Sequence, residues 1–261
     1  MSMDKQVLRL ICFVFTCMTV AQCYAATEVL KNDDGTDSKI KVFYQKASET
    51  QKQPTVLIAH GSAGVSANNY WWADVIHAWG YNTVVIDHYT LRGIARHVGR
   101  PVDGARMRDR ARDFADVVAW LDKQPWHSGR MSIVGFSQGG GGVMAFVSTE
   151  LMHEIGVMPN ADLHQVVAAV AFYPSCLFRK PPPQPRIPVL VFLGGKDDLA
   201  KPEYCEDMSD SRYVVKTYAD ATHSFDENLP FVVTAFTQRY NSNAVNESKE
   251  MMKKFLDSHL R

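Results

Sequence analysis

The 261-residue sequence has no excess of charge of either sign, because 28 lysine and arginine residues balance 28 aspartate and glutamate residues. No net field draws such a chain to nucleic acid or to an anionic membrane, so a small-molecule partner is expected. Familiar nucleotide and zinc motifs are also missing: no G-x-G-x-x-G follows a predicted strand, Gly195-Lys196 lacks a P-loop, and His153-Glu154 lacks a second histidine four residues on. We expect no metal and no cofactor.

The sequence also lacks a convincing membrane anchor at its start. The N-terminal apolar run at 10–21 follows two basic residues and is shorter than the roughly 20 residues that cross a bilayer. It leads into CYA at 23–25, a small-x-small sequence typical of a signal-peptidase site. We interpret residues 1–25 as a removed export signal, with no stable membrane insertion afterwards, and residues 26–261 as one domain. A buried N-terminal helix and a lipoprotein at Cys23 are the alternatives.

Cysteine is scarce, and three of the five cysteines precede residue 26. Removal of the signal leaves Cys176 and Cys205 as an even pair in an oxidising compartment. A disulfide between them is therefore our hypothesis, with two buried free cysteines as the alternative.

Apolar, β-branched runs bounded by turn residues alternate with segments of helical periodicity. The predicted strands are residues 39–44, 55–59, 83–86, 131–134, 166–172, 189–193 and 213–218. The predicted helices are residues 69–79, 105–123, 140–153 and 248–259. Strands and helices that alternate in this way form a mostly parallel central sheet with helices on both faces, so the sequence predicts an α/β fold.

One glycine-flanked serine lies where a predicted strand meets a predicted helix. Residues 135–139 read GFSQG and follow the strand at 131–134. In a G-x-S-x-G elbow, the glycines let neighbouring backbone approach a strained serine, and the next helix offers N–H groups to an oxyanion. We therefore predict Ser137 as a nucleophile and the Gln138 N–H as an oxyanion donor. A glycine-rich packing turn without chemistry is the alternative.

A serine nucleophile requires a base and an acid at the same sheet edge. His223 follows the strand at 213–218, late in the chain as the Ser, Asp, His order requires, whereas His259 lies in a predicted terminal helix. Asp197 and Asp198 follow the strand at 189–193, and we favour Asp197 as the acid that orients the histidine. A charged surface turn is the alternative at this position.

A loop of small residues, HGSAG at 60–64, follows the strand at 55–59. Its backbone N–H groups can face the elbow. We assign the second oxyanion donor to Ser62, with Ala63 as the fallback, and interpret His60 as a hydrogen-bonded structural residue rather than a base.

Four segments resemble those of the dienelactone hydrolase family within the α/β-hydrolase superfamily: HGSAG at 60–64, GFSQG at 135–139, GGKD at 194–197 and ATHSF at 221–225. The resemblance implies Ser137 as nucleophile, Asp197 as acid and His223 as base. The name-giving enzymes use a cysteine nucleophile, whereas this chain has serine, and the serine-bearing relatives are esterases or are uncharacterised. The resemblance therefore implies hydrolysis of an ester or lactone.

A basic segment near the expected pocket follows a strand edge and contains Arg92, Arg96, His97 and Arg100. A guanidinium there, with Arg92 as the candidate, can bind a substrate carboxylate in bidentate fashion. We favour a solvated basic loop here, because the charge continues along the next helix at 106, 108, 110 and 112. The leading hypothesis is thus an exported, periplasmic or secreted serine hydrolase of small esters or lactones. An acyltransferase or peptidase with the same triad and a binding module without turnover are the rivals.

Overall fold

The computed structural model describes residues 26–32, 35–94, 104–157, 163–176, 184–205, 208, 212–229 and 235–261. The predicted export signal, residues 1–25, lies outside these ranges. At the centre is an eight-stranded sheet in the order β1-β2-β4-β3-β5-β6-β7-β8. Its strands are β1 (Ala26–Lys31), β2 (Asp37–Gln45), β3 (Gln53–Ala59), β4 (Asn82–Asp87), β5 (His127–Phe136), β6 (Val166–Phe172), β7 (Val189–Gly194) and β8 (Tyr213–Tyr218).

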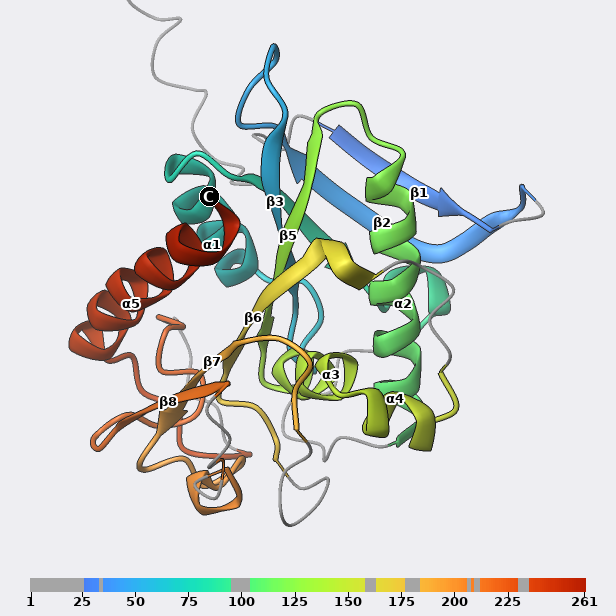
Figure 1. The fold of residues 1–261 in the computed structure, drawn as a ribbon. Helices are drawn as coiled ribbons and strands as arrows, with labels where there is room; N and C mark the ends of the chain where they lie inside the picture. Colours follow the sequence, from blue (N-terminus) through green and yellow to red (C-terminus); the bar gives the residue numbers. More distant parts are fainter. Residues whose placement is uncertain are drawn as a thin grey trace, which may run out of the picture.

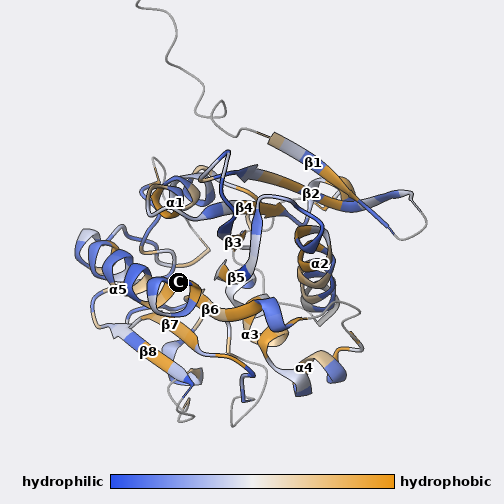
Figure 2. Cartoon of the chain, turned by 45° about the horizontal axis from the view of Figure 1, so that its top comes forward, coloured by the Kyte–Doolittle hydropathy of each residue, from blue (hydrophilic) through white to orange (hydrophobic). Residues whose placement is uncertain are grey.

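The sheet is parallel from β4 through β3, β5, β6 and β7 to β8, whereas β1 pairs antiparallel with β2 and β2 pairs antiparallel with β4. This confirms the predicted fold class. Strand β1 was not predicted, because its sequence ATEVLK is short and only one of its residues is buried. In Figure 2, β6 and β7 are hydrophobic along their length, as expected for strands covered on both faces.

Helices cover both faces of the sheet (Figure 1). The helices are α1 (Ala67–Ala78), α2 (Gly104–Asp122), α3 (Gln138–Val147), α4 (Thr149–Glu154) and α5 (Ser242–Leu260), with short 3-10 turns η2 (Thr90–Arg92), η3 (Leu163–Gln165) and η4 (Pro202–Tyr204). Helices α1 and α5 pack on one face through Trp72 and Leu256, while α2 and α3 pack on the other through Phe114 and Phe146. The sheet therefore lies between two apolar layers, one on each face.

Two of the predicted helices differ from the structure by more than two residues. The helix expected over 140–153 is interrupted at Ser148, whose ψ of 119° leaves the helical region and whose hydroxyl accepts from the Leu151 N–H to cap α4. Helix α5 begins at Ser242 rather than at 248, because the Asn241 side chain accepts from the Ala244 N–H as an N-cap. Both differences arise from side-chain caps that outweigh the apolar spacing.

Cys176 and Cys205 form a disulfide with their Cα atoms 5.3 Å apart. The bond joins the segment after β6 to the segment after β7. The two cysteines are therefore bonded to each other and are not free thiols. The bond links the two loops covalently at the carboxyl edge of the sheet.

Candidate active site

Ser137 lies on a strained turn between β5 and α3, with φ 50° and ψ −115°. Such a conformation costs a non-glycine residue about 1–3 kcal/mol. A Cβ on Gly135 would lie 2.4 Å from the carbonyl oxygen of Gly139, and a Cβ on Gly139 would lie 2.4 Å from that of Ala59. Only glycine fits at both positions, so the elbow sequence is also a steric requirement of the fold.

Ser137, His223 and Asp197 form a continuous chain of hydrogen bonds. The His223 Nε2 lies 2.8 Å from the Ser137 hydroxyl, and the His223 Nδ1–H donates to Asp197 Oδ2 at 2.7 Å. The other oxygen of Asp197 accepts from the backbone N–H groups of Leu199 and Ala200 at 2.9 and 2.7 Å. The carboxylate is buried and fully oriented, so it fixes the histidine ring with Nε2 toward the serine.

The neighbouring acid, Asp198, has different hydrogen-bond partners. Its carboxylate is exposed and accepts from the backbone N–H and the hydroxyl of Thr237. Asp198 therefore anchors the segment that follows the histidine loop and does not contact the ring. Of the two acids that the sequence left open, the structure brings Asp197 to His223.

Two glycines allow the acid and base loops to touch. A Cβ on Gly194 would lie 2.8 Å from the carbonyl oxygens of Ala221 and Thr222, and a Cβ on Gly195 would lie 2.8 Å from that of Ala219. The N–H of the following residue, Lys196, donates to the Ala221 carbonyl at 2.8 Å. Side chains at 194 or 195 would push the two loops apart and separate the acid from the base.

The loop after β3 lies against the nucleophile. A Cβ on Gly61 would lie 3.4 Å from the Ser137 Cβ, and both Ser62 and Ala63 line the cavity above the serine. On the other side, Gln138 is the first residue of α3. The loop that contains Ser62 and the first residue of α3, Gln138, both adjoin Ser137, and their role as oxyanion donors stays a prediction.

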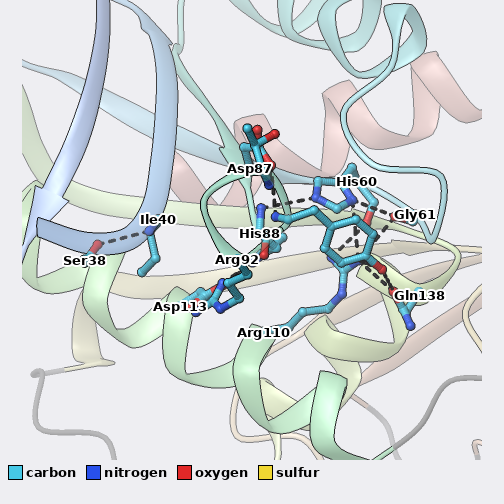
Figure 3. A network of polar contacts seen from close by, with 12 residues as sticks. Ser38, Ile40, His60, Gly61, Asp87, His88, Arg92, Arg110, Asp113 and Gln138 are labelled. Carbon is cyan, nitrogen blue, oxygen red and sulfur yellow. Dashed lines mark hydrogen bonds and ion pairs between the residues drawn. The ribbon is translucent and has the colours of Figure 1, made fainter. Parts of the chain in front are cut away.

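Arg110 of α2 lies behind both of these backbone elements (Figure 3). Its guanidinium donates to the carbonyl oxygens of His60 and Gly61 at 2.9 and 3.2 Å and to the Gln138 side-chain oxygen at 2.8 Å. The Gly61 carbonyl and the Ser62 N–H belong to one peptide group, so a donor on the carbonyl orients the N–H to the opposite side. The sequence indicated a solvated basic helix here, but Arg110 is only 1% exposed.

His60 has a structural role in the same network. Its Nε2 accepts from the His88 backbone N–H at 3.2 Å, which fixes Nδ1 as the protonated nitrogen that faces the Gly61 carbonyl at 2.6 Å. Burial, then the charge of Arg110, hold the pKa of His60 well below its ordinary value. The imidazole is neutral and fully engaged, in agreement with its interpretation as a structural residue.

Arg92 does not lie where a substrate carboxylate would bind. Its two terminal nitrogens donate to the two oxygens of Asp113 at 2.7 and 2.6 Å, and one also donates to the His88 carbonyl. It is not among the described residues that line the cavity. The expectation that Arg92 binds a substrate carboxylate is therefore corrected, because both terminal nitrogens of its guanidinium already donate to a buried aspartate of α2. Arg96 and Arg100 lie outside the described residues.

A cavity of about 410 Å³ opens above the triad. Its wall includes Ser137, His223, Tyr173, Ser224 and Tyr70. Among the described residues, the non-glycine residues with positive φ are Ser137, Tyr173 and Ser224, and all three line this cavity. Backbone strain is thus concentrated at one place, as is common at functional sites.

A buried carboxylate three residues beyond the base supports the cavity wall. Asp226 accepts from the Tyr173 hydroxyl at 2.6 Å, from the Trp72 indole N–H at 2.7 Å and from the Asn68 amide at 2.8 Å. It thereby links α1 to the segment after β6 and to the His223 loop. The sequence offered only a weak signal for it, an acid shortly after the histidine.

Within the described residues, no group of three or more His, Cys, Asp or Glu side chains is arranged to hold a metal ion. No helix in that part of the chain is both long enough and apolar enough to cross a membrane.

The fold and the serine elbow define an α/β-hydrolase. The model of the dienelactone hydrolase family matches residues 41–260, so the chain belongs to that family. This confirms the resemblance found in the sequence. A comparison with curated proteins found no match.

Several solved structures share the fold. A dienelactone hydrolase-like promiscuous phosphotriesterase from metagenomic libraries has a TM-score of 0.70 at 17% identity, covering 90% of this chain and 99% of its own. An esterase from Pyrococcus furiosus has a TM-score of 0.64 at 15% identity, covering 90% and 93%. Thermogutta terrifontis esterase 2, phosphorylated by paraoxon, has a TM-score of 0.62 at 19% identity, covering 90% and 94%.

Proposed function

We propose that the chain is a serine hydrolase that cleaves a small ester or lactone through an acyl-enzyme on Ser137. The observation that carries the proposal is the hydrogen-bond chain from Ser137 through His223 to Asp197 beneath the cavity. Membership of the dienelactone hydrolase family supports it. The names of two similar structures, both esterases, point to the same chemistry.

In the first half-reaction, the Ser137 oxygen attacks the acyl carbon while its proton passes to His223 Nε2. Asp197 stabilises the imidazolium that forms. The backbone N–H groups of Gln138 and Ser62 stabilise the tetrahedral oxyanion, helped by the amino end of α3. The alcohol leaves with the proton from His223, and the acyl group stays on Ser137.

In the second half-reaction, His223 takes a proton from water, and the hydroxide attacks the acyl carbon of the acyl-enzyme. The second tetrahedral intermediate uses the same two N–H groups. Its collapse releases the acid, and the proton held by His223 returns to the Ser137 oxygen. For a lactone, the alcohol and the acid leave as one molecule.

The test is turnover of p-nitrophenyl acetate and butyrate by the wild type and by Ser137→Ala. We expect the variant to lose about 10⁴-fold or more in kcat, because the nucleophile is absent. Ser258→Ala, an exposed serine near the end of α5, is the matched control and keeps wild-type turnover. Wild-type rates in Ser137→Ala would refute the proposal.

Paraoxon provides a second test that does not depend on the choice of ester. One similar esterase is phosphorylated by this compound. We expect a phosphoryl adduct on the peptide that contains Ser137, found by mass spectrometry, and none in Ser137→Ala. An unlabelled wild-type protein would favour a binding module without turnover.

We further propose that residues 1–25 direct export and that residues 26–261 form one domain. The first strand begins at Ala26, and the disulfide between Cys176 and Cys205 suits an oxidising compartment. Expression with the native N-terminus in a bacterial host should yield a mature protein in the periplasm or medium that begins near residue 26. An unprocessed N-terminus in the cytoplasm would contradict this.

A further inference from the structure

The described wall of the cavity carries one acidic side chain and no basic lysine or arginine. Among the described lining residues, Glu227 is the only aspartate, glutamate, lysine or arginine. The remaining wall is formed mainly by apolar and aromatic groups and by small residues of the loop after β3. A substrate carboxylate would therefore meet another carboxyl group there and no described lysine or arginine.

Glu227 is held at the wall by its backbone. Its N–H donates to the Ser224 carbonyl at 3.0 Å, and its carbonyl accepts from the Gln238 amide. Ser66, another lining residue, lies near its carboxyl group and acts to lower the pKa of that group. Among the described residues, no lysine or arginine forms an ion pair with it. The carboxyl group is thus positioned beside the cavity with no described lysine or arginine to pair with it.

Nearby carboxylates add to the negative field. Asp226, the preceding residue, is held by neutral donors from Asn68, Trp72 and Tyr173. Burial, then the charge of Asp226, raise the pKa of Glu227 to about 7. A cation that entered the cavity would relieve this repulsion and restore the ionised form of Glu227.

A hollow beside the cavity carries a third acid. It shares Gly64, Val65 and Tyr70 with the main cavity and also contains Asp87. The Asp87 carboxylate accepts from two backbone N–H groups of the η2 turn and is not matched by a lysine or arginine in the described wall of the hollow. The acidic character therefore extends from the cavity into the adjoining hollow.

Aromatic rings complete an environment suited to an ammonium group. Tyr70, Tyr173 and Phe236 line the same cavity as Glu227. Ring faces attract organic cations, and they do so more strongly where water is excluded. A carboxylate together with several rings recognises a positive charge that is attached to an apolar body.

We infer that Glu227 determines specificity by selecting small esters that carry an ammonium group, over neutral and anionic esters of the same size. This inference rests on the proposed ester hydrolysis, since it names the substrate class of that site.

The test compares isosteric esters that differ only in charge. Acetylcholine is paired with its analogue in which a tert-butyl group replaces trimethylammonium, and the p-nitrophenyl ester of trimethylammoniobutyrate is paired with its own tert-butyl analogue. We expect wild-type kcat/KM to favour the ammonium member of at least one pair by about 10- to 100-fold. In Glu227→Gln that ratio falls toward one.

The control is Glu250→Gln, which removes the same charge from an exposed position on α5 and keeps the wild-type ratio. An equal ratio in the wild type and Glu227→Gln would overturn the inference. So would a wild-type preference for the tert-butyl esters or for the p-nitrophenyl monoester of glutarate.

A binding measurement separates this inference from the proposed hydrolysis. Butyltrimethylammonium is titrated by calorimetry into Ser137→Ala and into the double variant Ser137→Ala/Glu227→Gln. We expect binding to weaken about tenfold or more in the double variant. If this loss is seen while no ester is hydrolysed by the wild type, hydrolysis fails and the cation site stands; equal binding by both proteins overturns the site.

Discussion

Within the part of the chain that the structure describes, two buried histidine–aspartate pairs have almost the same geometry. His223 Nδ1 lies 2.7 Å from Asp197 Oδ2, and His88 Nδ1 lies 2.6 Å from Asp113 Oδ2. The pairs differ at the other ring nitrogen. His223 Nε2 meets the Ser137 hydroxyl at 2.8 Å, whereas His88 Nε2 has no hydrogen-bond partner within the described residues.

The surroundings explain the difference. His223 lies in a loop at the cavity, while His88 lies between β4 and η2 and faces Asp113 of α2, as Figure 3 shows. Burial, then the charges of Arg110 and Arg92, hold the pKa of His88 well below its ordinary value. A histidine held by a carboxylate is therefore not a base by that fact alone, because it also needs a proton donor to act on and space for a substrate.

The sharpest way to test the contrast is to replace each histidine by asparagine. His223→Asn should lower kcat for p-nitrophenyl acetate by about 10⁴-fold or more, because no base remains for Ser137. His88→Asn should keep kcat within about tenfold of the wild type once the folded fraction is taken into account. Equal losses of kcat in the two folded variants would show that the pairs act together.

The second test replaces the aspartate of each pair by asparagine. Asp113→Asn leaves the half-buried Arg92 without its counter-charge, so we expect a loss of about 3–5 kcal/mol in the free energy of unfolding. Asp197→Asn should instead act mainly on kcat, because it disturbs the orientation of His223. Urea denaturation and steady-state kinetics on both variants measure this. A stability loss in Asp197→Asn larger than that in Asp113→Asn would contradict the assignment.

The third test concerns Arg110, which lies between the two pairs and holds the Gly61 carbonyl and the Gln138 side chain. Arg110→Met should lower kcat about 10- to 100-fold with a much smaller change in KM, since it disturbs the groups that face the oxyanion. Arg112→Met, an exposed position on the same helix, is the matched control. Partial recovery of kcat in Arg110→Lys would support orientation by charge, whereas a change confined to KM would argue against it.

The smallest expected effect is in the pH dependence of stability. Because the pKa of His88 is lower in the folded chain than its unfolded value, the unfolded chain binds more protons as the pH falls below about 6.5. His88 therefore contributes a loss of stability on acidification, with a slope of at most about 1.4 kcal/mol per pH unit. Urea denaturation at pH 7 and pH 5 should show a shallower loss in His88→Asn than in the wild type, and equal slopes would contradict this.

The sequence predicted what depends on local pattern. The elbow around Ser137 and the loops that carry Asp197 and His223 follow apolar strands, and turn residues mark where each strand ends. The fold follows for the same reason, because strands and helices alternate. The structure then brings the three side chains within hydrogen-bond distance, although catalysis by them remains a prediction.

What the sequence missed depends on partners that are distant in the chain. In the sequence, Arg92 has no evident partner. In the folded chain, α2 places Asp113 within hydrogen-bond distance of its guanidinium. Arg110 sits in a helix rich in charge, and periodicity does not show which of those charges points inward to the loop after β3. Glu227 is one acid in a polar loop, and only the folded chain places it beside the cavity.

The disulfide between Cys176 and Cys205 makes the choice of expression host an experimental variable. A preparation from a reducing cytoplasm would contain two thiols in place of the bond. On the chain-entropy model, closing a loop with a sequence separation of 29 is worth about 3–4 kcal/mol, so such a sample should melt at a lower temperature than one made in the periplasm. Because the bond spans the loops that bear Tyr173 and Asp197, activities from the two preparations are comparable only after the thiols have been counted.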